Sequence, residues 1–191
     1  MPDKTTNVFI CGVGGQGILL ASEILSELAL SKGLDVKKSE VHGMAQRGGA
    51  VVSHVRFGPK VYSPVIADGE ADILASFEKL EALRWLHALA PGGKLVVNAQ
   101  EITPSGLETY PENVDRELDS RAPERHTIDA LSMAMRAGHP RAVNTVMLGA
   151  FSNFLPFTVE EWRAAIEKRV PPKTVDINVK AFELGRAAVS A

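Results

Sequence analysis

The stretch Asn7-Val8-Phe9-Ile10-Cys11-Gly12-Val13-Gly14-Gly15-Gln16-Gly17 decides the fold of this chain. Its apolar run ends at Gly12, and an amphipathic pattern with a helical period begins after Gly17. The pattern predicts a buried strand, a glycine turn and a helix. Gly12, Gly14 and Gly17 fit the G-x-G-x-x-G spacing, which presents backbone N–H groups and a helix N-terminus to an anionic or carbonyl group. The alternative is that the glycines serve only a tight turn.

Length and composition indicate one α/β domain over residues 1–191. The chain has 191 residues, 45% of them hydrophobic, and a net charge of −2. This length suits one core, and the near-neutral charge without a basic run argues against nucleic-acid binding. No stretch is long and apolar enough to span a membrane, and the polar residues 1–7 are unlike a signal peptide. We therefore expect a cytoplasmic protein with no membrane or nucleic-acid partner.

Cys11 is the only cysteine. One thiol cannot form an internal disulfide, supply a Cys-rich zinc site or ligate an iron–sulfur cluster, which needs several thiolates. Any redox centre must come from another chain. Because Cys11 ends an apolar strand, we expect a packed small hydrophobe rather than a reactive thiol.

A second glycine-rich loop follows a weaker strand predicted at residues 34–41. It reads His42-Gly43-Met44-Ala45-Gln46-Arg47-Gly48-Gly49. The loop leaves the sheet at the same carboxyl edge as the first turn, so the two loops should converge where open α/β sheets bind ligands. Arg47 offers a planar donor fork for phosphate or carboxylate. The candidate cofactor-binding residues are Gly12, Gly14, Gly15, Gln16, Gly17, His42, Gln46, Arg47 and Gly48.

The remaining patterns predict a sheet that is mixed but has a parallel core. Residues 50–57 alternate in polarity and turn through residues 58–60 into 61–65, which predicts an antiparallel hairpin. A strand at 73–77, a helix ending near residue 90 and a strand at 95–97 follow. Residues 100–125 predict a surface excursion with short strands that lies on a partner. Four helices are expected in the C-terminal third of the chain. The first spans residues 129–137, the second ends at Phe154, the third follows a Thr158/Glu161 capping box, and the fourth begins at Thr174.

The sequence lacks the motifs of several common enzyme classes, and we assign no catalytic residue. There is no G-x-S-x-G elbow, and Ile18 follows Gly17 where a P-loop would carry lysine. A metal shared by His42 and His54 would lack a third ligand, so no metal site is expected. Glu40 is near the position of a ribose-binding acid, but the lysines before it favour a solvated strand edge.

The chain resembles the gamma-domain family of 2-oxoacid:ferredoxin oxidoreductases. The resemblance rests on four segments that span nearly the whole chain in family order: residues 12–17; residues 40–49 followed by 52–56; Asn144 with 148–150; and Asn178 with 181–182 and 185. Members acting on pyruvate or 2-oxoglutarate tend to carry Tyr-Gly-Pro where this chain has His42-Gly43-Met44. The difference favours the type that acts on aryl-pyruvates, a class that includes indolepyruvate, but it does not say which aryl-pyruvate is used.

This resemblance implies a three-layer, Rossmann-like α/β/α domain that works beside a large subunit. That subunit would hold thiamine diphosphate and iron–sulfur clusters, pass electrons to ferredoxin, and use coenzyme A as the acyl acceptor. The present chain would bind no redox cofactor alone. The crevice between the two loops would face the thiamine site or the coenzyme A path, with Arg47 and the amides of residues 14–17 as anion donors. An isolated chain could form a homodimer through the surface meant for the partner.

Four alternatives remain at this stage. A stand-alone nicotinamide or flavin oxidoreductase would use the same glycines but should show a clear ribose-binding acid. A methyltransferase is suggested by residues 89–95, although that turn is chemically generic. Residues 14–17 are also similar to ubiquitin-activating-type adenylating enzymes, which usually add a zinc site. The last alternative is a structural assembly subunit whose crevice binds no ligand.

Overall fold

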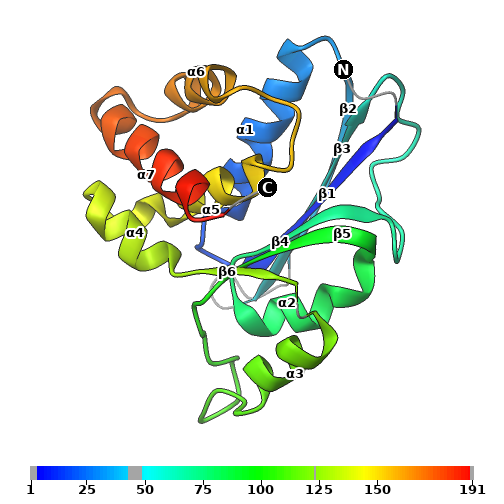
Figure 1. The fold of residues 1–191 in the computed structure, drawn as a ribbon, viewed down its shortest axis with the longest axis vertical. Coiled ribbons are helices and arrows are strands. Elements are labelled where there is room, and N and C mark those ends of the chain that lie inside the picture. Colours follow the sequence, from blue (N-terminus) through cyan, green and yellow to red (C-terminus); the bar gives the residue numbers. More distant parts are fainter. Residues whose placement is uncertain (1–3, 43–48, 123, 190–191) are drawn as a thin grey trace.

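The computed structural model describes residues 4–42, 49–122 and 124–189 and contains one six-stranded sheet (Figure 1). The strand order is β2-β3-β1-β4-β5-β6. β1 pairs in parallel with β4, β4 with β5 and β5 with β6, whereas β3 runs antiparallel to both β1 and β2. The strands are β1 (Thr6–Val13), β2 (Asp35–His42), β3 (Ala50–Gly58), β4 (Ala71–Ser76), β5 (Leu89–Asn98) and β6 (His126–Ile128). The predicted mixed, mostly parallel sheet is confirmed.

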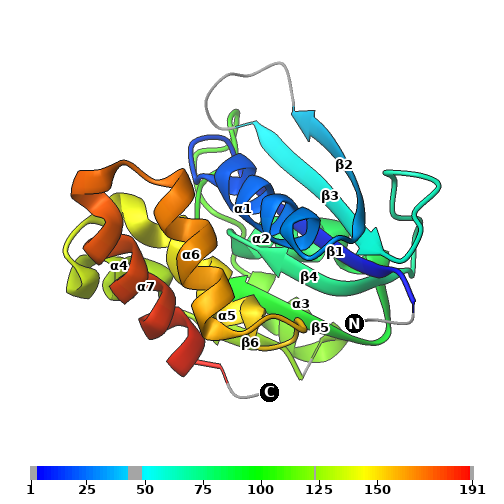
Figure 2. The same cartoon turned by 90° about the horizontal axis from the view of Figure 1, so that it is seen from above.

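Helices cover both faces of the sheet, which makes three layers (Figures 1 and 2). One face carries α1 (Ile18–Ser31), α4 (Ala130–Ala137), α5 (Val143–Ser152), α6 (Val159–Arg169) and α7 (Val175–Ala187). The other face carries α2 (Lys79–Trp85) and α3 (Val114–Arg121). Short 3₁₀ turns lie at Leu86–Ala88, Pro140–Ala142 and Pro172–Thr174. No helix within the described ranges is long and apolar enough to cross a membrane.

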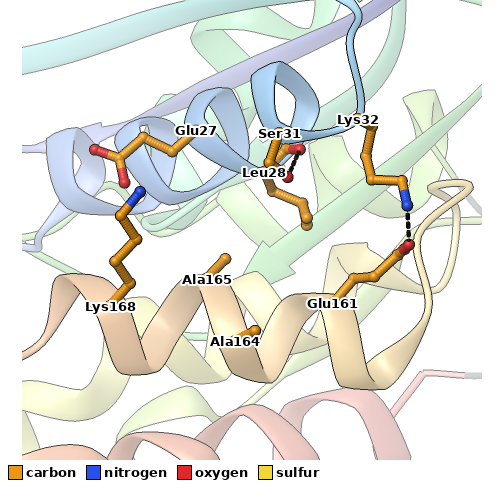
Figure 3. Close-up of a pocket in the computed structure, with 8 residues that line it drawn as sticks. All are labelled: Glu27, Leu28, Ser31, Lys32, Glu161, Ala164, Ala165 and Lys168. Atoms are coloured by element: carbon orange, nitrogen blue, oxygen red, sulfur yellow. Dashed lines mark hydrogen bonds and ion pairs between the residues drawn. The ribbon is translucent and has the colours of Figure 1, made fainter.

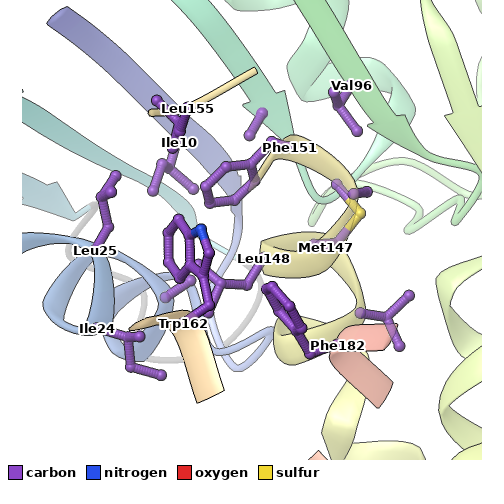
Figure 4. Close-up of a cluster of buried hydrophobic side chains, with 14 of the residues drawn as sticks. Ile10, Ile24, Leu25, Val96, Met147, Leu148, Phe151, Leu155, Trp162 and Phe182 are labelled. Carbon is purple, nitrogen blue, oxygen red and sulfur yellow. The ribbon is translucent and has the colours of Figure 1, made fainter. Parts of the chain in front are cut away.

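The larger core lies between the sheet and the five-helix layer (Figure 4). Trp162 packs edge-on against Phe157 and tilted against Phe182, and all three side chains are buried. The capping box predicted for α6 is present, because the Thr158 hydroxyl accepts from the Glu161 amide while the Glu161 carboxylate accepts from the Thr158 amide. The cap positions the start of the helix that carries Trp162 into the core.

Two glycines allow α5 and α7 to touch through their backbones. A Cβ at Gly149 would overlap the Phe182 carbonyl, and a Cβ at Gly185 would overlap the Val146 carbonyl. Any larger residue at either position would push the two helices apart. Because α5 also supplies part of the functional site, this contact holds one wall of that site in place.

The predicted hairpin partner of residues 50–57 is wrong. Residues 61–65 form no strand, and β3 instead pairs with β1 on one edge and with β2 on the other. Side chains bind the backbone of this segment: Asp35 accepts from the Val61 amide, and Arg56 donates to the carbonyls of Ser63 and Val65. Since both edges of β3 are already paired, no strand edge is left for residues 61–65.

The short strands expected in residues 100–125 are also absent from the described part of that segment. It carries α3 instead, whose Val114 and Leu118 are buried one helical turn apart against the α2 side of the sheet. Only these two residues of α3 form its apolar face, and charged residues surround them, so the sequence shows no clear helical period in this segment. Cys11 is fully buried as expected, and burial raises the pKa of its thiol.

Candidate functional site

The glycine turn after β1 has the geometry that its spacing predicts. Gly15 and Gly17 have φ of 99° and 80°, in the left-handed region that favours glycine. Gly17 is the N-cap of α1, and the first turn of this helix contains no acidic residue and no capping side chain. Gly12 has no space for a side chain, because a Cβ would lie 2.8 Å from the Phe77 Cβ. α1 therefore begins at the turn, and no carboxylate compensates the positive end of its helix dipole.

Gln16 fastens this turn to two neighbouring strands. Its Oε1 accepts from the Val13 amide at 2.7 Å, while its Nε2 donates to the Phe77 carbonyl at 2.7 Å and to the Gln100 Oε1 at 3.1 Å. Asn98 extends the network, since its Nδ2 donates to Phe77 and Gln100 and its Oδ1 accepts from the Ala130 amide. The Gln16 amide group is thus engaged inside the protein, where it shapes the turn.

The first glycine turn contacts Gly49, the last residue of the second glycine-rich loop. The Gly14 amide donates to the Gly49 carbonyl at 2.9 Å, and Ala50 lies opposite Val13 in the β1–β3 register. This hydrogen bond occupies the Gly14 amide, which we had expected to serve as an anion donor. His42 is exposed at the end of β2. The candidate residues Gln46, Arg47 and Gly48 lie outside the described residues.

A hollow of about 440 Å³ opens beside the glycine turn at the carboxyl edge of the sheet. Its far wall comes from the 3₁₀ turn Pro140–Ala142 and the start of α5, which the sequence did not predict as part of the crevice. The described lining consists of Gly15, Gln16, Gly17, Leu20, Gln100, Leu131, Pro140, Arg141, Val143 and Asn144. We call this hollow the glycine-turn pocket.

The electrostatics of the glycine-turn pocket favour an anion. α1 has no capping side chain and no acidic residue in its first turn. α5 has no acidic residue in its first turn either, but it continues directly from the 3₁₀ turn Pro140–Ala142, which is capped because the His139 Nδ1 accepts from the Arg141 amide. The uncapped N-terminus of α1 therefore opens at a pocket that Arg141 also lines. The third helix, α4, contributes less, because the Asp129 carboxylate already caps it by accepting from the Ser132 amide.

Asn144 is the most buried polar side chain in the pocket lining. It is 5% exposed, and the contact is so close that a Cβ at Gly17 would lie 2.9 Å from the Asn144 Cβ. Glycine at position 17 thus serves two purposes, a left-handed backbone and the approach of Asn144. Asn144 belonged to the family resemblance, but Arg141 and Gln100 carried no comparable signal and were missed.

The residues weighed for other chemistry do not gather at this pocket. Glu40 lies on the α1 side of β2, where its carboxylate pairs with Lys38 at 2.7 Å rather than lying free for a ribose. His54 accepts from the Ile66 amide and stacks edge-on against Phe9. Burial, and then the Arg56 charge, lower the pKa of His54. By the β2–β3 register, His42 and His54 fall on opposite faces of the sheet, so they do not form one metal site.

A separate hollow of about 290 Å³ lies between α1 and α6 (Figure 3). The small side chains of Ala164 and Ala165 leave this gap, and the Lys32–Glu161 pair at 2.5 Å closes one end. Arg169 also pairs with Glu23, which joins the same two helices. None of the predicted site residues lines this gap. We interpret it as imperfect packing between α1 and α6, which the ion pairs join.

Comparison with known proteins gives consistent matches along the chain. The family model described as pyruvate ferredoxin/flavodoxin oxidoreductase matches residues 7–188. The indolepyruvate oxidoreductase subunits IorB of Pyrococcus horikoshii and Thermococcus kodakarensis are each 42% identical, with 95% of both chains covered. A solved 2-oxoglutarate:ferredoxin oxidoreductase from Magnetococcus marinus shares the fold at a TM-score of 0.75 and 20% identity, over 98% of this chain and 31% of that one. The chain therefore belongs to the pyruvate ferredoxin/flavodoxin oxidoreductase family, in which its relatives are subunits of oxidoreductases that act on 2-oxoacids.

Proposed function

We propose that this chain is the small subunit of an indolepyruvate, or aryl-pyruvate, ferredoxin oxidoreductase, and that its glycine-turn pocket binds the phosphate groups of coenzyme A. The observation that carries the pocket assignment is the meeting of the uncapped N-terminus of α1 with Arg141 and the first turn of α5. Phosphate binds such helix ends through backbone N–H groups and the helix dipole. Arg141 would add a charge-assisted hydrogen bond.

The larger subunit would supply the redox cofactors. An iron–sulfur cluster needs several thiolates, whereas this chain has one thiol, buried beneath Ser76 and α2. The residues here therefore do not suit a cluster. Thiamine diphosphate and the clusters belong to the partner in this proposal, and electrons leave through that partner to ferredoxin. The role of the present chain is to position coenzyme A, whose thiol accepts the acyl group.

Two findings support this choice of substrate and co-substrate. The IorB relatives are named for indolepyruvate and are 42% identical to this chain, and His42-Gly43-Met44 differs from the Tyr-Gly-Pro expected of the pyruvate and 2-oxoglutarate types. The Magnetococcus marinus enzyme, which shares this fold, was solved with coenzyme A bound. The first finding concerns the substrate and the second concerns the class of ligand.

Kinetics of the assembled complex test the pocket assignment. In Arg141→Ala the KM for coenzyme A should rise at least tenfold, because one charged hydrogen bond to phosphate contributes roughly 1.5 to 3 kcal/mol. The KM for indolepyruvate should not change. Arg136→Ala is the matched control, since Arg136 is an exposed arginine on α4 that does not line the pocket. Equal coenzyme A constants in the two variants would remove the pocket from the proposal.

Arg47 is tested in the same assay. We expect Arg47→Ala to change the rate or the coenzyme A dependence, because the loop that carries it ends against the glycine turn at Gly49. If neither quantity changed, Arg47 would lose its role as an anion donor. Activity with indolepyruvate that clearly exceeds activity with pyruvate or 2-oxoglutarate would support the substrate class, and the reverse order would overturn it.

A further inference from the structure

Asn144 lies at the buried end of the glycine-turn pocket. It is 5% exposed, whereas Arg141, which lines the same pocket, is exposed. Asn144 is the second residue of α5, and the backbone contact between α5 and α7 fixes the position of that helix. The pocket therefore has a buried polar group at one end and a solvent-exposed guanidinium at the other.

The carboxamide of Asn144 has hydrogen-bonding capacity that the fold does not use. Its Nδ2 donates to no acceptor among the described residues, and the Thr145 hydroxyl is 3.5 Å from its Oδ1. That hydroxyl has one hydrogen, which it donates to the Asn178 Oδ1 at 2.7 Å, so the longer contact contributes little. The Nδ2 is not one of the described polar atoms that are fully enclosed without a partner, so it keeps accessible surface. Asn144 is thus largely buried and still able to donate to a ligand.

This donor lies beside the start of α1. A Cβ at Gly17 would be 3.1 Å from the Asn144 Nδ2. Gly17 is the N-cap of α1, whose first turn receives no capping side chain and contains no acidic residue. The first N–H groups of a helix have no partner within the helix. A side-chain donor therefore lies next to several backbone donors, and no side chain of the described residues supplies them with an acceptor.

A group of donors without an acceptor suits an oxyanion. The dipole of α1 and the charge of Arg141 favour a negative ligand, and the described lining contains no carboxylate that would favour a cation. Leu20, Leu131 and Pro140 line the rest of the pocket and provide apolar surface for the organic part of the ligand. The chemistry of the lining thus matches a phosphate ester.

We propose that Asn144 is a ligand-binding residue of the glycine-turn pocket, and that its Nδ2 donates to an oxygen of a phosphate ester held at the N-terminus of α1. The identity of the ester as coenzyme A rests on the proposed function. Arg141 supplies charge from the exposed side, whereas Asn144 supplies a donor whose position is fixed by packing. Because this donor cannot follow a displaced ligand, it sets the depth at which the phosphate is held.

Replacing Asn144 by aspartate separates ligand binding from a structural role. Asn144→Asp keeps the size of the side chain and places a carboxylate at the starts of α1 and α5, where the helix dipoles favour negative charge. The melting temperature of the isolated full-length chain, in phosphate-free buffer at pH 7, should be unchanged or higher. Inorganic phosphate should raise the melting temperature of the unaltered chain at constant ionic strength and should not raise that of Asn144→Asp. No response in the unaltered chain, or an equal response in the variant, would overturn the assignment.

Two further variants complete this titration. Asn113→Asp is the matched control, because Asn113 is exposed at the start of α3 and does not line the pocket. It adds the same charge at another helix start and should leave the response to phosphate unchanged. Asn144→Ala removes the donor without adding a charge, so it decides the question if the buried carboxylate prevents folding. Phosphate should bind to it at least tenfold more weakly, and unchanged phosphate affinity would contradict the proposal.

Kinetics of the assembled complex separate the role of Asn144 from the proposed function. Asn144→Ala should raise the KM for coenzyme A at least tenfold and leave the KM for indolepyruvate unchanged. If Arg141→Ala raises the KM for coenzyme A and Asn144→Ala does not, the proposed function stands and the role of Asn144 is wrong. If neither variant changes this KM, coenzyme A does not bind in the pocket and that part of the proposed function fails. The phosphate titration then still decides whether Asn144 binds an oxyanion.

Discussion

The two pockets at the carboxyl edge differ in charge although the same strand ends form both. The glycine-turn pocket lies on the α1 side, where the uncapped start of α1 meets Arg141. A second hollow, of about 150 Å³, lies on the α2 side, where the one helix start is already capped by Glu78 and a second buried acid, Glu81, follows. Its described lining consists of Val13, Ala50, Glu78, Leu80, Glu81, Arg84, Ile102 and Pro104. A strand end thus has no charge preference of its own. The charge is set by whether the next helix receives its cap from a glycine or from a carboxylate.

The largest effect should come from Gly149→Val, which removes one of the two pockets. The new side chain overlaps the Phe182 carbonyl, and backbone cannot move aside as a flexible side chain can. We expect a loss of at least about 3 kcal/mol in the free energy of unfolding, measured by urea denaturation. Ala187→Val adds an apolar branch at an exposed position of α7 and should cost well under about 1 kcal/mol. Similar losses in both variants would mean that α5 and α7 are not in backbone contact.

A matched pair of glycine substitutions sharpens the comparison. Gly17 and Gly33 have similar φ values, 80° and 75°, but only Gly17 faces a neighbour, whereas Gly33 faces open space. Gly33→Ala should cost about 1 to 2 kcal/mol for the left-handed backbone alone. Gly17→Ala should cost roughly 1 kcal/mol more, because Asn144 must move, and should also raise the KM for coenzyme A. Equal destabilisation by the two variants would show that the Gly17–Asn144 contact does not constrain the pocket.

The smallest expected effect concerns the hydrogen bond from Tyr110 to Glu78, on the α2 side of the sheet. Burial, and then the hydrogen bond to Glu78, raise the pKa of Tyr110. A raised folded-state pKa stabilises the protein below the unfolded value near 10, and this stability is lost as the pH rises above it. Tyr110→Phe should cost about 1 kcal/mol at neutral pH and should make the decline above pH ~10 shallower. Tyr62 is exposed, so Tyr62→Phe should leave both quantities unchanged; an unaltered alkaline decline in Tyr110→Phe would show that this hydroxyl does not stay protonated.

The sequence predicted the parts of the fold that depend on local patterns. The strand, turn and helix at residues 7–31 and the capping box at Thr158 follow from residue spacing and backbone geometry. The meeting of the two loops also followed, because parallel strands present their carboxyl ends at one edge. The predicted hairpin with residues 61–65 was wrong, because the alternating polarity of residues 50–57 does not indicate which strands will pair with its two edges.

The site itself was only half visible in the sequence. The glycines of the turn could be recognised, since each answers a local requirement of the backbone. Arg141 and Gln100 lie 124 and 83 residues beyond Gly17, and nothing in their own segments marks them as neighbours of the turn. Glu81 lies in the first turn of α2, and the burial of its Oε2 without a hydrogen-bond partner among the described residues results from the packing of α2 against the sheet.

By itself, therefore, the sequence determined that a glycine turn would present a helix start beside a second glycine-rich loop, and the family resemblance added the reaction. Only the tertiary structure decided which distant residues complete the crevice and that an acidic pocket lies behind it. The physical reason is the range of the interactions. Turns, caps and amphipathic periods are settled within a few residues, whereas the charge of a pocket depends on elements that long-range packing brings together.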